Sequence, residues 1–227
     1  MTNDSLTQHG NNLHTFDCKQ CPRLSGFLQA VKTKYPDYYA CPVSAFGDIH
    51  PKLLIVGLAP GMHGANRTGR PFTGDYAGIL LYQTLHQFGF STRPESVATD
   101  DGLQLLGCRI TNAVKCLPPE NKPILQEIKQ CNQYLTTEIN EFVQNDGMAV
   151  LALGTVAHQA TLMSLQLRSK DYPFGHGAIH HLPLRNGLKL YDSYHCSRYN
   201  TQTKRLTAEM FKQVFDKIVA DIKLQEH

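Results

Sequence analysis

Cysteines are the residues of this chain whose type and spacing most directly suggest chemistry. Cys18 and Cys21 are separated by two residues, and Cys116 and Cys131 lie much further along the 227-residue chain. A Cys-x-x-Cys pair binds one metal from a single turn, and two more thiolates complete a tetrahedral set. A zinc ribbon usually repeats the two-residue spacing, and this chain does not. The spacing alone therefore leaves a zinc site, an iron–sulfur cluster and a redox pair open.

A glycine-rich segment from Gly57 to Gly78 is the second chemical feature. Six of its residues are glycine, and it lies between an apolar run and a helical pattern. Glycine lets a backbone pass close to a ligand, and the amides at a helix start favour an anion. Neither the GxGxxG nor the GxxxxGKS fingerprint is present, and the segment is too long for a simple connection. The pattern indicates a binding loop of another kind.

The elements that must position these residues alternate along the chain. Short apolar runs predict strands at 52–58, 108–114, 148–153 and 189–193, and helical periodicity covers 77–90, 124–143, 155–167 and 206–222. Such alternation predicts an α/β fold with a mostly parallel sheet. Ligands of these sheets bind beyond the carboxyl ends of the strands, where the glycine-rich loop, Asn112 and His195 fall.

Composition sets broad limits on the kind of protein. The apolar fraction of 41% supports a packed core, and we expect a polar leader at 1–15 followed by one domain at 16–227. The net charge of +3 neither requires nor excludes a nucleic-acid partner. No apolar stretch approaches the ~20 residues that cross a bilayer, and no signal peptide is evident. We expect a cytoplasmic monomer with no membrane partner, in which disulfides do not persist.

Four segments together resemble one enzyme family. They are the glycine-rich loop, Cys18–Leu24, Thr111–Pro123 and His195–Thr203. These segments are similar to motifs of the bacterial and archaeal uracil-DNA glycosylases of family 5, the type b enzymes, and family 4 has a related loop. The resemblance runs from about residue 16 to the C-terminus. It implies a three-layer sandwich with a central, mostly parallel four-stranded sheet flanked by helices. It also implies a [4Fe–4S] cluster on Cys18, Cys21, Cys116 and Cys131.

The same resemblance assigns roles around a pocket for a flipped base. A glycosylase cannot reach the glycosidic bond inside a duplex, so it extrudes the nucleotide. Phe72 matches the stacking aromatic, Asn112 the residue that reads the uracil edge, and His195 the donor to uracil O2. Asp75 matches the carboxylate that stabilises the cationic sugar, although its position also permits it to cap the next helix. Three further pocket positions lie on the first loop: Gly57, Ala59 and Gly61.

DNA containing uracil or another damaged base is the implied partner, in the cytoplasm and nucleoid of a prokaryote. Six residues are candidates for contacts with the DNA: Asn66, Arg67, Arg70, Arg198, Tyr199 and Asn200. The family also implies a broad range of bases, including hydroxymethyluracil, ethenocytosine and hypoxanthine.

Two departures from the family pattern affect the interpretation. Cys196 replaces the proline that usually follows the motif histidine. Leu58, Ala59 and Pro60 offer no polar side chain where many relatives carry one. The second departure supports an alternative, a non-catalytic iron–sulfur protein that binds damaged DNA without cutting the glycosidic bond.

Overall fold

A six-stranded sheet forms the centre of the molecule in a computed structural model that describes residues 17–184 and 187–225. The predicted leader at 1–15 lies outside those residues. The strand order is β1-β3-β2-β4-β6-β5. Its four middle strands are mutually parallel, which confirms the predicted sheet: β2 (Leu53–Gly57), β3 (Cys108–Asn112), β4 (Ala149–Leu153) and β6 (Lys189–Ser193).

The sheet is wider than the four strands predicted. Strand β1 (Phe46–Gly47) pairs antiparallel with β3, and β5 (Ile179–His181) pairs antiparallel with β6. These edge strands are two and three residues long. They are too short to show the alternating pattern from which a strand is recognised in a sequence.

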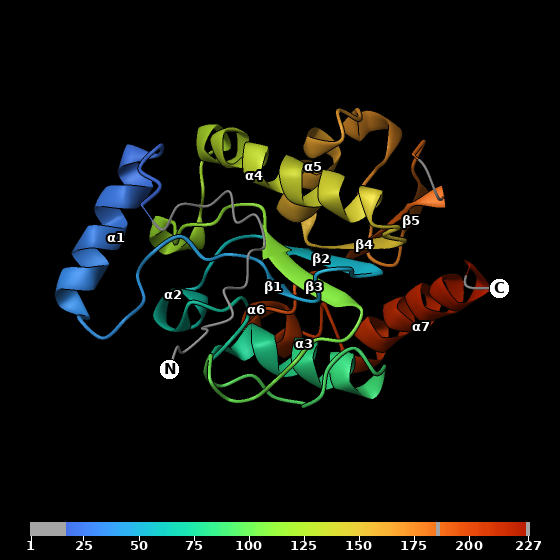
Figure 1. The fold of residues 1–227 in the computed structure, drawn as a ribbon, viewed down its shortest axis with the longest axis horizontal. Coiled ribbons are helices and arrows are strands. Elements are labelled where there is room, and N and C mark those ends of the chain that lie inside the picture. Colours follow the sequence, from blue (N-terminus) through green and yellow to red (C-terminus); the bar gives the residue numbers. More distant parts are fainter. Residues whose placement is uncertain (1–16, 185–186, 226–227) are drawn as a thin grey trace, which may run out of the picture.

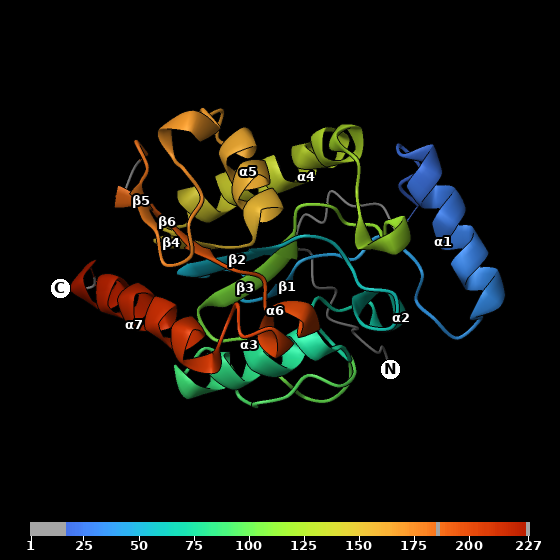
Figure 2. The same ribbon diagram turned by 180° about the vertical axis from the view of Figure 1, so that it is seen from behind.

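Helices cover both faces of the sheet, as Figures 1 and 2 show from opposite sides, so the three-layer arrangement is confirmed. Helices α3 (Tyr76–Gln87) and α7 (Ala208–Gln225) cover one face, and α4 (Leu125–Gln144) and α5 (Thr155–Ser164) cover the other. Side chains alternate along each strand. Leu53 and Ile55 of β2 therefore join the core with α3 and α7, whereas Leu54 and Val56 join the core with α4 and α5.

Helix α1 (Pro22–Lys34) was not predicted and lies to one side of the sandwich (Figure 1). It begins directly after Cys21, with a proline in its first turn, where the missing amide costs no hydrogen bond. Arg23 makes a two-pronged ion pair with Glu127 of α4, with both N–O distances at 2.7 Å. This pair fastens α1 to α4 near the cysteines.

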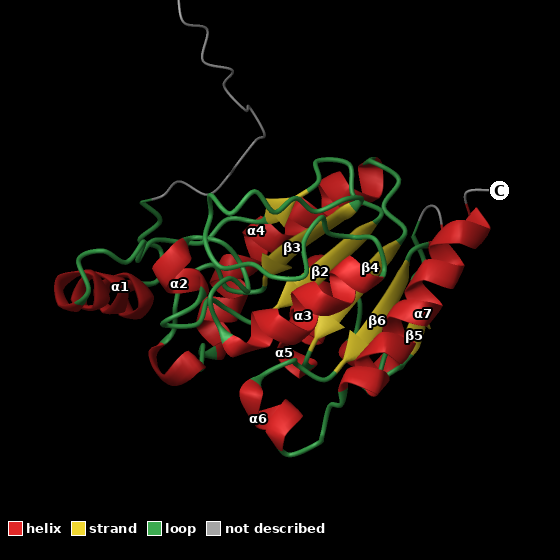
Figure 3. Ribbon diagram, turned by 90° about the horizontal axis from the view of Figure 1, so that it is seen from below, coloured by secondary structure: helices red, strands yellow, loops and turns green. Residues whose placement is uncertain are grey.

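Short helices lie near the carboxyl ends of the strands. They are α2 (Ala65–Thr68), α6 (Arg198–Gln202) and the single turn η1 (Pro119–Asn121), and a second turn, η2 (Ser169–Asp171), follows α5. Figure 3 shows α6 standing beyond the end of the sheet. Among the described residues, no helix is both long and apolar enough to cross a membrane.

Candidate active site and cysteine cavity

A cavity of about 430 Å³ opens at the carboxyl ends of β2, β3 and β6. Its volume lies in the ~300–1,000 Å³ range of small-molecule sites. Loops after three parallel strands therefore meet where an α/β sheet normally binds its ligand. The lining residues are Leu58, Ala59, Gly61, Ala65, Phe72, Asp75, Tyr76, Ala77, Asn112, Asn121, His195, Ser197 and Arg198.

Because Gly57, the last residue of β2, has no side chain, the side chains of Phe72 and Asn112 can both lie against its backbone. A Cβ atom at Gly57 would lie 2.4 Å from Asn112 Oδ1 and 2.7 Å from Phe72 Cζ. Phe72 is buried, and its ring stacks on that of His195 with an angle of 27° between the planes and 5.8 Å between the centroids. The aromatic face and the amide predicted to bind a base thus share one corner of the cavity.

The Asn112 side chain has an unused acceptor. Asn112 is only 3% exposed, and no donor among the described residues reaches its Oδ1 atom. A buried polar atom without a partner costs about 1–3 kcal/mol, so it normally awaits a ligand or an ordered water. The carboxamide also carries two N–H donors and is therefore suited to a ring edge that presents N–H and C=O together.

His195 follows β6 by two residues and lines the same cavity. Burial lowers the pKa of His195 to about 4, because the imidazolium form would lose its hydration there. The ring is therefore neutral near pH 7, with one N–H to donate. The backbone is held from both sides, since Asn200 Nδ2 donates to the His195 carbonyl at 2.8 Å and Gly154 N donates to the Ser193 carbonyl at 2.8 Å.

The two carboxylate oxygens of Asp75 have different neighbours, which bears on the choice that the sequence left between a helix cap and a catalytic carboxylate. Its Oδ1 atom caps α3 by accepting the amide of Gly78 at 3.0 Å. Its Oδ2 atom lies beside Gly61 and Gly64, where a Cβ atom at Gly64 would approach to 2.3 Å. Burial raises the pKa of Asp75, and the Gly78 amide opposes that shift. The carboxyl group thus caps a helix and also lines the cavity.

The mouth of the cavity holds residues that the sequence did not single out. Tyr76 is exposed, and the Arg198 guanidinium lies 5.8 Å from the centre of its ring. Asn121 also lines the cavity, in a left-handed turn with φ of 56°. Its only sequence signal was an asparagine in a proline-rich segment, which is typical of a turn.

The six predicted DNA contacts fall into different environments. Arg198 is exposed and lines the cavity, and the next residue, Tyr199, is also exposed. Arg67 is exposed while its Nε donates to the His63 carbonyl at 2.7 Å. Asn200 uses its amide internally, on His195.

Two of the six candidates need correction. Asn66 is 0% exposed and Arg70 is 5% exposed, and the Arg70 guanidinium is paired with Asp101. The glycine-rich loop folds inward at these two positions, so neither side chain is available to a phosphate.

All four predicted ligand cysteines line a second cavity, between α1 and α4. Cys18 and Cys21 come from the segment just before α1, Cys116 from the loop after β3, and Cys131 from α4. Burial raises the pKa of Cys131 to about 11, although Lys115 opposes the shift. The backbone amide of Lys115 donates to Cys131 Sγ at 3.3 Å, and Tyr134 Oη lies 3.4 Å from Cys18 Sγ. Four sulfur atoms with such neighbours are a donor set that fits an iron–sulfur cluster or zinc.

The other three cysteines do not line that cavity. Cys108 and Cys196 are fully buried in the main core, and Cys41 is half-buried. Cys196 also lies outside the lining of the first cavity. The thiol that replaces the usual proline therefore packs into the core rather than facing a substrate.

A separate buried group consists of His158, His180 and Asp192. His158 Nδ1 lies 2.7 Å from Asp192 Oδ1, and its Nε2 lies 2.9 Å from the Tyr172 carbonyl. His180 Nε2 lies 3.1 Å from Asp192 Oδ2. These hydrogen bonds bind the segment before β5 to the interior, behind the strand end that carries His195.

Comparison with known proteins identifies the class to which this fold and site belong. The family model of the uracil DNA glycosylase superfamily matches residues 44–222. The chain therefore belongs to that superfamily.

Relatives in two groups refine this placement. The chain is 46% identical to a type-5 uracil-DNA glycosylase of Thermus thermophilus, over 87% of this chain and 90% of the relative. It is 38% identical to one of Pyrobaculum aerophilum, over 90% and 89%. A type-4 uracil-DNA glycosylase of Thermotoga maritima is 32% identical, over 57% and 63%. This chain thus resembles the type-5 proteins over nearly its whole length and the type-4 proteins over a smaller part.

Proposed function

We propose that this protein excises uracil from DNA by hydrolysing the N-glycosidic bond, leaving an abasic site. The observation that carries the proposal is the unpartnered Asn112 Oδ1 atom, buried in a cavity that also holds an aromatic face and a carboxylate. Uracil presents an N–H between two carbonyl groups, so one carboxamide serves both kinds of atom. The names of the type-5 relatives support the same activity.

The pocket residues divide the work of binding the flipped base. Phe72 stacks on the face of the ring. Asn112 Oδ1 accepts the N3–H of uracil, and its amino group donates to O4. Extrusion costs a few kcal/mol of lost stacking and pairing, which these contacts offset.

Cleavage of the glycosidic bond leaves negative charge on the departing base and positive charge on the sugar, and a different pocket residue stabilises each. Neutral His195 donates to uracil O2 as negative charge develops on the departing ring, in the manner of an oxyanion hole. The Asp75 carboxylate stabilises the oxocarbenium-like sugar and orients the attacking water. Because Leu58 and Ala59 are apolar, Asp75 is the carboxylate in the cavity lining on which this step depends.

An assay for abasic sites tests the activity directly. A duplex with one uracil is incubated with excess protein and then treated with alkali, which cleaves at abasic sites. Strand breaks at the uracil position support the proposal. The alternative, a damage-binding protein without catalysis, predicts a shift of the duplex in a gel with no breaks.

The base range is proposed to extend beyond uracil. The cavity of about 430 Å³ leaves room beside the reading edge, and its first turn at Leu58 and Ala59 has no polar group that would reject a substituent. We expect excision of hydroxymethyluracil, ethenocytosine and hypoxanthine. A panel of duplexes, each with one such base, measures this range.

The four-cysteine cavity supports a [4Fe–4S] cluster. When bound, it would hold the N-terminal segment, α4 and the loop after β3 together, and we assign it no part in the reaction. Iron and acid-labile sulfide in equal amounts, with broad visible absorption, would support the proposal. Zinc without sulfide would contradict it. Cys131→Ser is expected to lose the absorption, whereas Cys41→Ser, a cysteine outside the cavity, is expected to keep it.

Gly57→Ala is expected to displace the side chains that bind the base and so to lower the single-turnover excision rate by about 100-fold. The added Cβ would lie 2.4 Å from Asn112 Oδ1 and 2.7 Å from Phe72 Cζ, so both side chains must move. Gly61→Ala provides the comparison, because its Cβ meets only Asp75 Oδ2, at 3.4 Å. Equal rates for the two variants would show that Asn112 and Phe72 do not need their observed places.

A further inference from the structure

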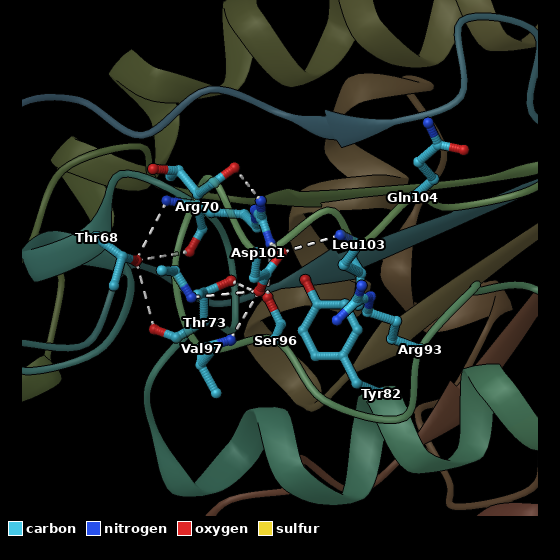
Figure 4. Close-up of polar contacts among 12 residues, drawn as sticks. Thr68, Arg70, Thr73, Tyr82, Arg93, Ser96, Val97, Asp101, Leu103 and Gln104 are labelled. Atoms are coloured by element: carbon cyan, nitrogen blue, oxygen red, sulfur yellow. Dashed lines mark hydrogen bonds and ion pairs between the residues drawn. The ribbon is translucent and has the colours of Figure 1, made fainter.

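Residues 91–105 lie in the connection between α3 and β3 and line no part of the active-site cavity. Their side chains and backbone form hydrogen bonds with the segment 70–75, which carries Phe72 (Figure 4). The connection between the two segments is the buried Arg70 side chain. Its Nη1 atom donates to Asp101 Oδ1 at 2.8 Å and to Ser96 Oγ at 3.0 Å. The guanidinium also lies 4.5 Å from the centre of the Phe46 ring. A group bound on so many sides has a fixed position.

Asp101 in turn fixes the conformation of its own loop. Its Oδ2 atom accepts the amides of Val97 and Ala98 at 2.9 and 3.2 Å, and its Oδ1 atom accepts the amide of Leu103 at 3.0 Å. Burial opposes ionisation, but Arg70 and these amides outweigh it and lower the pKa of Asp101 to about 2. Asp101 is therefore a permanent anion at neutral pH.

The backbone on both sides of Phe72 is tied to this network. Ser96 Oγ lies 2.6 Å from Thr73 Oγ1, and the Ser96 carbonyl accepts the amide of Gly74 at 3.1 Å. On the other side, Tyr82 Oη donates to the Pro71 carbonyl at 3.0 Å. Phe72 itself has φ of 53°, a left-handed conformation that is uncommon for a bulky residue. Such a conformation persists only where neighbouring contacts determine it.

We infer that Arg70, Ser96 and Asp101 are positioning residues, which hold Phe72 in its left-handed conformation and thereby set the stacking face for the base. This inference rests on the proposed function. Under this inference Arg70 has a structural role inside the protein instead of the contact with DNA that the sequence predicted.

The test is a double-mutant cycle on the single-turnover excision rate of a uracil duplex at saturating protein. Asp101→Asn is expected to lower the rate at least tenfold in the wild-type background. In the Phe72→Ala background the same change is expected to alter the rate less than about twofold, because no ring is left to position. Asp100→Asn is the matched control: it removes a charge from the adjacent, exposed position and is expected to have little effect in either background.

Ser96→Ala provides a second variant that keeps the charge pair and removes only the bond to Thr73. It is expected to follow the same pattern with a smaller loss. Hydrogen exchange gives a readout independent of activity, since the Gly74 amide should exchange faster in both variants than in Asp100→Asn. Thermal unfolding checks that each variant is folded at the assay temperature.

Three results would overturn the inference. The first is an equal loss of rate with and without the Phe72 ring, which would assign the network to general support of the fold. The second is an equal loss in Asp100→Asn. The third is unchanged exchange at Gly74. A wild-type protein that forms no abasic sites would instead remove the proposed function, and this inference with it.

Discussion

Asp75→Asn is expected to lower the single-turnover rate of uracil excision by about 100- to 1,000-fold and to leave the thermal midpoint unchanged. Asparagine keeps the oxygen that accepts the Gly78 amide at 3.0 Å, and it is as good a helix cap as aspartate. It removes only the negative charge beside the sugar. The variant therefore separates the proposed catalytic role from the capping role that the structure shows.

Asp75→Ala completes the comparison, because it removes the charge and the cap together. It is expected to match the asparagine variant in rate and to be less stable by about 1 kcal/mol. The raised pKa of Asp75 adds a pH test: wild-type activity should fall on acidification as this carboxylate is protonated, whereas the asparagine variant should lack that step. Full activity in Asp75→Asn would restrict this residue to capping.

His195→Ala is expected to have the second largest effect, about 100-fold or more on the same rate, because it removes a donor aimed at developing charge. Binding of the duplex should change far less than the rate. Abasic DNA, which lacks the leaving base, should bind the variant and the wild type equally. A loss confined to binding would instead make His195 a DNA contact.

The buried imidazole also has a consequence for stability. With a pKa of about 4 in the folded protein and 6.5 in the unfolded chain, His195 takes up a proton only on unfolding between these values. Its contribution to stability is thus fully present above about pH 6.5 and is lost as the pH falls to about 4, by up to about 3 kcal/mol. As the pH falls through this window, the free energy of unfolding of the wild type should decrease relative to that of His195→Ala. A constant difference between the two proteins would contradict the shift.

Much of the architecture could be predicted because the sequences of the central strands are short apolar runs. Strand β6 was predicted at its observed bounds, and β2, β3 and β4 within two residues. Helix α1 was missed because its buried side is narrow: only Leu24, Leu28 and Val31 are buried. The edge strands were missed because they hold two and three residues.

The site could be predicted less completely than the fold, because its supports depend on distant pairings. The motifs placed Phe72 and Asp75 in the loop after the first strand, and Asn112 and His195 near the ends of two others. The structure brings these four to one cavity. Nothing in the sequence near Arg70 shows that its partner is Asp101, since an arginine in a polar loop has the same local pattern whether it faces DNA or the interior. Arg198 was predicted as a DNA contact, but its contact with the Tyr76 ring could not be predicted, for the same reason.

The parallel pairings of the sheet have a consequence for the order in which the pocket is made. Leu53 pairs with Cys108, and Ala149 pairs with Lys189, so each pairing must wait for a long stretch of chain to be synthesised. His195, the last pocket residue that would touch the base, comes after the last of these strands. A chain that still lacks β6 therefore also lacks the residue that we propose donates to the leaving base. In the proposed mechanism, excision therefore requires the last parallel strand to be in place, and activity would report that the sheet is complete.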